Sequence, residues 1–205
     1  MKDQILPTLG GQWIVEVHDC KGSLLHRQSE PMKSFVANFS RCIVRLGFRN
    51  QGSMRMFTLD LANPATGGVV GPPQASNVWF RWVGLQGSYS GIIVGSSGRA
   101  VQGTDNRLGT AYRPGGTTTL RLTHNRGTWI SETKTAGTIT ERYQRTFTNN
   151  SGSALPVREI GFAPVFETPG AVQRPVLMIR DKLGTVAIVN NLTTLTVTYD
   201  LWTVR

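Results

Sequence analysis

Cysteine is scarce in this 205-residue chain, which contains only Cys20 and Cys42. Two cysteines exclude a disulfide-rich scaffold, and we expect both to be free thiols in a protein made in a reducing cytoplasm. No stretch approaches the roughly 18 apolar residues that a membrane span needs. The N-terminal sequence MKDQILPTLGG has neither an apolar core nor a small-residue cleavage site, so we expect no signal peptide.

Acidic residues are also few. The chain has 22 Lys and Arg against 12 Asp and Glu, so its net charge is 22 − 12 = +10. Seventeen of the basic residues are Arg, and they are dispersed without a run of three. Nucleic-acid binders usually concentrate their charge on one stripe or arm, so nucleic acid is an improbable partner. Dispersed Arg suits pairing with carboxylates across protein interfaces, and the net charge favours acidic surfaces.

Charged residues make up only 17% of the chain, whereas Gly is abundant (23 residues) and turn sequences recur. This composition is typical of an all-β, loop-rich protein. A compact domain of this length removes roughly 70% of its unfolded-chain surface from water and needs no disulfide or metal. No domain boundary is evident, so we expect residues 1–205 to form a single β-rich domain.

The C-terminal third reads as one strand after another. Residues 138–148 (TITERYQRTFT) alternate between two faces with a period of two, which predicts a half-buried strand. Further strands are predicted at 155–162, 175–180, 186–189 and 192–204. We therefore expect an antiparallel β-sandwich, jelly-roll-like, with strands that alternate apolar and polar side chains.

The first half is more varied. Residues 13–18 and 24–28 are predicted to form a hairpin around the turn at 19–22. One amphipathic helix is predicted at 33–47, because apolar side chains recur there at helical spacing; they are Phe35, Val36, Phe39, Ile43 and Leu46. Further predictions are strands at 54–61, 77–83 and 90–95, a hairpin joining 117–124 to 128–134 around 125–127, and long surface loops at 63–77 and 96–116.

Each candidate catalytic motif lacks a required residue or spacing, and we predict a non-enzyme without metal or cofactor. The stretch 87–91 (GSYSG) has Tyr89 where a nucleophile elbow has serine. The three histidines have no metal-ligand spacing. The glycine-rich stretch 95–98 follows a strand, but neither a helix nor a P-loop lysine comes after it. Glu159 and Asp181 form a conceivable carboxylate pair, although two residues do not define a glycosidase.

One pair of residues stands out physically. Glu159 and Arg180 each lie inside an apolar predicted strand, and a carboxylate in such a place is costly unless it is paired. If the two strands are neighbours, the residues form a structural ion pair. The alternative is that both side chains point to solvent from the polar faces of their strands.

Several short segments, taken together in their order, resemble a known class of proteins. They are the N-terminal hairpin (13–17, then Gly22), the predicted helix with Phe35, Asn38, Leu46 and Gly47, IIVG (92–95), Thr104-Asp105 with Leu108, RTFTN (145–149), Ser151-Gly152, VREIGF (157–162), LMIRD (177–181) and LTVTY (195–199). This succession resembles small virion structural proteins of tailed bacteriophages, and it spans most of the chain. The stretch 95–98 and the loop 63–77 depart from the usual pattern.

The resemblance implies a non-enzymatic virion protein, made in the cytoplasm of a bacterial host. Its implied role is to dock symmetrically on the capsid as a decoration (cement) protein, with other virion proteins as partners, namely the major capsid or tail proteins. The alternative is a tail, collar or fibre component that attaches to the host through carbohydrate binding. A homo-oligomer, most simply a trimer, is expected in either case.

Overall fold

The computed structural model describes residues 8–36, 56–57, 69–70, 79–81, 90–105, 107–115, 121–135, 137–168 and 172–204. Within these ranges the chain forms strands, turns and bends but no helix, so the prediction of a mainly β protein is confirmed. The strands are β1 (Thr8–His18), β2 (Leu24–Pro31), β3 (Met56–Phe57), β4 (Val69–Val70), β5 (Trp79–Arg81), β6 (Gly91–Gly95), β7 (Arg113–Pro114), β8 (Arg121–His124), β9 (Thr128–Thr135), β10 (Thr138–Thr148), β11 (Leu155–Ala163), β12 (Val165–Thr168), β13 (Val172–Pro175), β14 (Ile179–Val189) and β15 (Thr194–Val204).

The largest sheet has the strand order β2-β1-β15-β10-β8-β7, and β9 also pairs with β10. Its pairs are antiparallel except for β7 and β8, which run parallel. β15 is central and pairs along its whole length with both β1 and β10. Side chains at alternate positions of β1, Trp13, Val15 and Val17, are buried, as expected of strands that have one face in a core.

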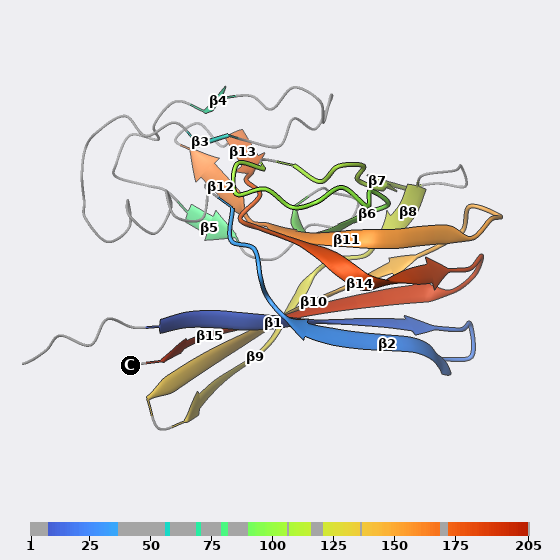
Figure 1. Ribbon diagram of the computed structural model, residues 1–205, viewed down its shortest axis with the longest axis horizontal. Coiled ribbons are helices and arrows are strands. Elements are labelled where there is room, and N and C mark those ends of the chain that lie inside the picture. The colour runs from blue at the N-terminus through green and yellow to red at the C-terminus, as the bar shows by residue number, and fades with distance from the viewer. Residues whose placement is uncertain are drawn as a thin grey trace, which may run out of the picture.

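The second sheet has the order β14-β11-β6 and is antiparallel. Two smaller sheets, β13-β12-β5 and β3-β4, complete the described pairings. Side chains of the two main sheets meet in one buried cluster. At its centre the ring of Phe162 lies 5.6 Å from that of Tyr143 and 5.7 Å from that of Tyr199. Figure 1 shows β11 and β14 on one side of this cluster, with β1, β10 and β15 on the other.

The predicted helix at 33–47 is wrong at its N-terminal end. Phe35 forms an isolated antiparallel bridge with Ile179, and the N–H of Val36 donates to the carbonyl of Met178 at 3.0 Å. The segment is extended because pairing with the second sheet satisfies its backbone, a long-range effect that a local apolar spacing does not report. The remainder of the predicted helix lies outside the described residues.

Two strand predictions are corrected in their connections. The predicted run 175–180 is divided, because Pro175 ends β13 and Ile179 begins β14. β14 also contains the predicted run 186–189 and pairs with β11 on both sides of an irregularity. Several residues of β14 between these runs are exposed, and in the sequence they look like a turn that separates two strands. The predicted hairpin around 125–127 is not formed between β8 and β9. Both strands instead pair with β10, and the hairpin joins β9 to β10 beside Gly137, whose φ is +83°.

The expectation that loop 96–116 avoids the core is also wrong. Its side chains Leu108 and Tyr112 are buried, and the Tyr112 hydroxyl donates to the carbonyl of Pro156 at 2.8 Å. This loop covers a face of the second sheet, because Leu108 packs in a cluster with Ile93, Ala163 and other apolar side chains. Loop 63–77 lies outside the described residues apart from the two residues of β4.

Candidate functional site: a buried ion-pair network

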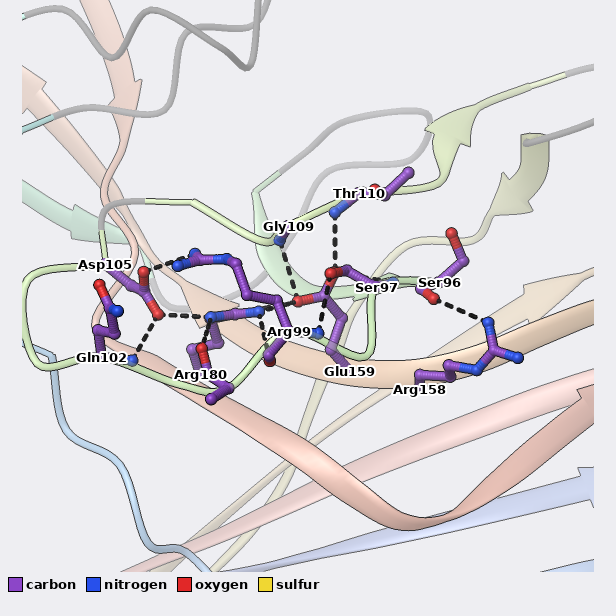
Figure 2. A network of polar contacts seen from close by, with 11 residues as sticks. Ser96, Ser97, Arg99, Gln102, Asp105, Gly109, Thr110, Arg158, Glu159 and Arg180 are labelled. Carbon is purple, nitrogen blue, oxygen red and sulfur yellow. Dashed lines mark hydrogen bonds and ion pairs between the residues drawn. The ribbon is translucent and has the colours of Figure 1, made fainter.

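The position of Glu159 follows from an irregularity in β11. The register with β14 shifts between Val157 and Glu159. Before the shift Val157 packs in the large core, and after it Ile160 and Phe162 do so. Glu159 therefore lies on the opposite face, beneath the loop that follows β6 (Figure 2).

The side chain of Glu159 has no exposed surface, yet it accepts five hydrogen bonds. The Nε and Nη2 atoms of Arg180 donate to Oε2 at 2.9 and 2.7 Å, and the N–H of Gly109 donates to the same oxygen at 3.0 Å. The other oxygen accepts from the N–H of Thr110 at 2.9 Å and of Ser97 at 3.3 Å. The structure thus joins Glu159 and Arg180, the two residues that the sequence singled out, in a buried ion pair in which two guanidinium N–H groups share one carboxylate oxygen.

Arg180 extends the network to a second carboxylate. Its Nη1 donates to Oδ2 of Asp105 at 2.5 Å, and its guanidinium also donates to the carbonyls of Arg99 and Ala100, each at 3.3 Å. Asp105 accepts two further bonds, from Nη2 of Arg99 at 2.6 Å and from the N–H of Gln102 at 2.8 Å. The two buried carboxylates are thus balanced by two guanidinium groups, one of them partly exposed.

The charge balance has a consequence for Asp105. Burial by itself would raise the pKa of its carboxyl group, but hydrogen bonds from the Gln102 N–H, Arg99 and Arg180 outweigh burial and lower the pKa below its ordinary value. Asp105 is therefore held ionised, as the pairing with Arg180 requires.

Two glycines make the close approach of the loop possible. A Cβ at Gly95 would lie 2.5 Å from the carbonyl oxygen of Thr110 and 2.6 Å from Oε1 of Glu159. A Cβ at Gly109 would lie 2.3 Å from Oγ of Ser97. Any larger residue would displace the loop and with it the N–H groups that surround the carboxylate.

The backbone N–H groups of the loop form an anion-binding site, and the carboxylate of Glu159 from the same chain occupies it. The sequence argued against a phosphate cradle at 95–98, and the Ser97 N–H there binds an internal carboxylate instead. The outer side of the network opens into a polar hollow of about 460 Å³ lined by Arg99, Asp105 and Arg107, among others. With five donors on its two oxygens, Glu159 has little capacity left to accept a substrate proton.

A second buried guanidinium connects the two main sheets. Arg145 of β10 is almost fully buried and donates to the carbonyls of Ser90 and Ile92 at 2.6 and 2.9 Å, and to that of Asn125 at 2.8 Å. Burial lowers the pKa of Arg145 to about 10. Arg145 lies on the same face of β10 as Tyr143 and Phe147, which are also buried.

The other residues considered in the sequence do not converge. Asp181 pairs in register with Ile160, which packs in the core, so it lies on the opposite face from Glu159 and the two form no carboxylate pair. No group of three or more His, Cys, Asp or Glu suited to a metal occurs in the described ranges. Asp105 and Gly109 were not singled out for the network, because only the folded loop brings them to Arg180. Tyr89 lies outside the described residues.

The fold and the network define a mainly β protein whose loop is fixed by buried ion pairs. Comparison with known proteins found no matching family model, no matching curated protein and no matching solved structure. In the part of the chain that the structure describes, no helix is long and apolar enough to cross a membrane.

Proposed function

We propose that this chain is a non-enzymatic structural protein of a tailed-phage virion, which docks on the capsid as a decoration protein. It folds as a single-domain β-sandwich with a jelly-roll-like arrangement of its two main sheets, is made in the host cytoplasm, and acts as a homo-oligomer. Its partners are other virion proteins, the major capsid protein first among them.

The observation that carries the proposal is the role of the segments that resemble virion proteins. Asp105, Glu159 and Arg180 come from three of these segments, and they meet in one buried network. The network binds backbone groups of the loop, so these segments specify how a loop is held on a sheet. Residues that maintain a rigid surface suit a coat component better than residues that receive a substrate.

The charge of the chain supports a capsid partner. At +10 the protein is attracted to an acidic shell, and long-range attraction of this kind speeds association. The exposed basic side chains are spread over several elements, as a broad protein contact requires; Arg27, Arg113, Arg121 and Arg158 are examples.

Electron microscopy of virions made with and without this chain tests the proposal. We expect purified virions to contain the chain, and virions made without it to lose density at symmetric positions on the capsid. Mass spectrometry of the same particles supplies the independent measurement. Virions that never contain the chain would refute the virion role, whereas lost density on the tail would refute only the capsid position.

A second candidate is a tail, collar or fibre component that binds carbohydrate. One observation favours it: Trp129 on β9 is 47% exposed, and sugar rings stack on exposed aromatic faces. A glycan array would show binding that Trp129→Ala removes. An array without any signal from the wild-type protein would dismiss this candidate.

A further inference from the structure

Leu192 combines two unfavourable features in the turn between β14 and β15. Its φ is +64°, in the left-handed region that a leucine rarely adopts and that Gly or Asn usually fills. Its side chain is also 59% exposed. Single exposed apolar side chains are common, and it is the strained backbone that makes Leu192 a reason to look for function.

The turn that presents Leu192 is held firmly. Its N–H donates to the carbonyl of Asn149 at 2.7 Å, and the N–H of Thr193 donates to the carbonyl of Asn190 at 3.1 Å. Asn149 itself is buried and donates through Nδ2 to the carbonyl of Val189 at 2.7 Å. Leu192 is therefore a knob on a rigid support, which loses little conformational entropy when it binds.

An apolar hollow of about 200 Å³ lies at the other end of the same sheet. Its lining is mainly apolar and includes Leu9, Phe35, Ile139, Met178 and Leu201. The side chain of Leu9 is 37% exposed, so the hollow opens to the surface. A cavity of about 150 Å³ in another protein accepts benzene, so this hollow has room for a leucine side chain.

Leu192 cannot reach the hollow of its own molecule. The two features are separated by most of the length of β15, which corresponds to about 30 Å at the usual rise of a strand. Figure 1 shows the β14–β15 turn at one end of the sheet and the C-terminus at the other.

We propose that copies of this chain associate head to tail, with Leu192 of one copy inserted into the hollow beside Leu9 of the next. The occupant is a second copy because one molecule has both complementary parts. Charge agrees with this choice: Glu141 lines the hollow, whereas the Leu192 end carries Arg121 on β8 and Lys21 beside Asp19 in the β1–β2 turn. A contact between two different patches closes into a ring when its rotation permits and otherwise forms a filament.

This inference rests on the self-association included in the proposed function, and it adds which surfaces are in contact and in which direction the copies follow one another.

The test uses sedimentation velocity on the full chain over a concentration series. Leu192→Gly removes the knob and relieves the left-handed strain, while Leu9→Asp puts a charge at the mouth of the hollow. Each substitution should weaken association at least about tenfold, the effect of losing a central contact residue. Ile188→Asp, at an exposed apolar position of β14, is the matched control and should leave association unchanged.

A mixture of the two variants gives the sharpest result. Leu192→Gly keeps an intact hollow and Leu9→Asp keeps an intact knob, so together they should form a one-to-one dimer and nothing larger. A wild-type chain that stays monomeric up to about 1 mM would overturn both this contact and the proposed self-association. Oligomers that persist in both variants would overturn the contact alone. Neither result bears on the virion location, which electron microscopy decides separately. Thermal unfolding confirms that each variant is folded.

Discussion

Glu159 shows how a single buried charge is tolerated in this protein. Removing a carboxylate from water costs several kcal/mol, and here five N–H donors, two of them from Arg180, replace the water. The neighbouring arginine is equally buried, so neither residue is stable without the other.

Glu159→Gln should destabilise the protein by about 3–5 kcal/mol, because buried Arg180 loses one of its two charged partners and an amide NH₂ then faces N–H donors. The free energy of unfolding from urea titrations measures the effect. The same substitution at Glu16, whose ion pair with Arg27 is partly exposed, is the control and should cost about 0–1 kcal/mol. Equal effects at the two positions would contradict the importance assigned to burial.

Asp181 should make stability depend on pH in the opposite sense to most carboxylates. Burial raises the pKa of Asp181 to about 6, and its Oδ2 has no hydrogen-bond partner among the described residues. Lys33 and Glu30 are the charged groups near it, and Tyr199 is affected by its charge. Since the folded pKa lies above the unfolded value near 3.8, the stabilisation from protonation is complete below about pH 3.8 and is lost as the pH rises through 6.

Asp181→Asn should therefore stabilise the protein by about 2–3 kcal/mol at pH 8 relative to pH 4, with wild type compared at each pH. Asp200→Asn is the control with the opposite sign. Burial would raise the pKa of Asp200, but its bonds with Arg142 and Gln12 lower it, so that substitution should be harmful at pH 8 and less so in acid. Urea midpoints across this range measure both effects. Parallel pH profiles for wild type and Asp181→Asn would contradict the prediction.

At the scale of elements, the loop that follows β6 depends on close packing at Gly109. Gly109→Ala would place a Cβ 2.3 Å from Oγ and 2.5 Å from Cβ of Ser97, so the loop must move and the N–H bond to Glu159 must lengthen. We expect a loss of about 1–3 kcal/mol, typical of overpacking. Gly103→Ala in the same loop meets no atom within 4 Å and should change stability by less than about 1 kcal/mol. Differential scanning calorimetry compares the two variants; similar losses would show that the loop is not held by close packing.

The strands that the sequence predicted well are those with local alternation. β10 (Thr138–Thr148) has the predicted bounds, and β11 and β15 lie close to theirs. β1 begins at Thr8 rather than at residue 13, and β2 ends at Pro31 rather than at residue 28. The connections between strands were predicted less well. Asn125-Arg126-Gly127 has turn residues, but the chain uses them to step along β10 rather than to reverse. Such choices depend on strands that are distant in sequence.

Only some residues of the candidate site could be predicted from the sequence. Glu159 and Arg180 were visible because charges interrupt apolar strands. Asp105 and Gly109 were not, because they lie in a polar, glycine-rich loop where such residues are ordinary, and their role depends on which strand the loop covers. Leu192 had no local signal, since its left-handed conformation comes from the hydrogen bonds of the turn to Asn149.

At the scale of the whole molecule, buried and exposed charges should respond differently to salt. The buried pairs are shielded from ions, whereas docking of a chain of net charge +10 on an acidic shell acts through solvent. Raising the salt concentration from about 0.1 M to about 1 M shortens the range of exposed charge interactions from about 10 Å to about 3 Å.

We expect particle binding, measured by co-sedimentation with virions that lack the protein, to weaken strongly over this range of salt concentration. The circular dichroism spectrum should stay the same, because the ion pairs that hold the fold are inside it. Head-to-tail association should weaken much less in high salt, because its central contact, Leu192 in the hollow, is apolar and charges lie only around it. Binding to particles that is unchanged at 1 M salt would show that docking, like the contact between copies, is apolar rather than electrostatic.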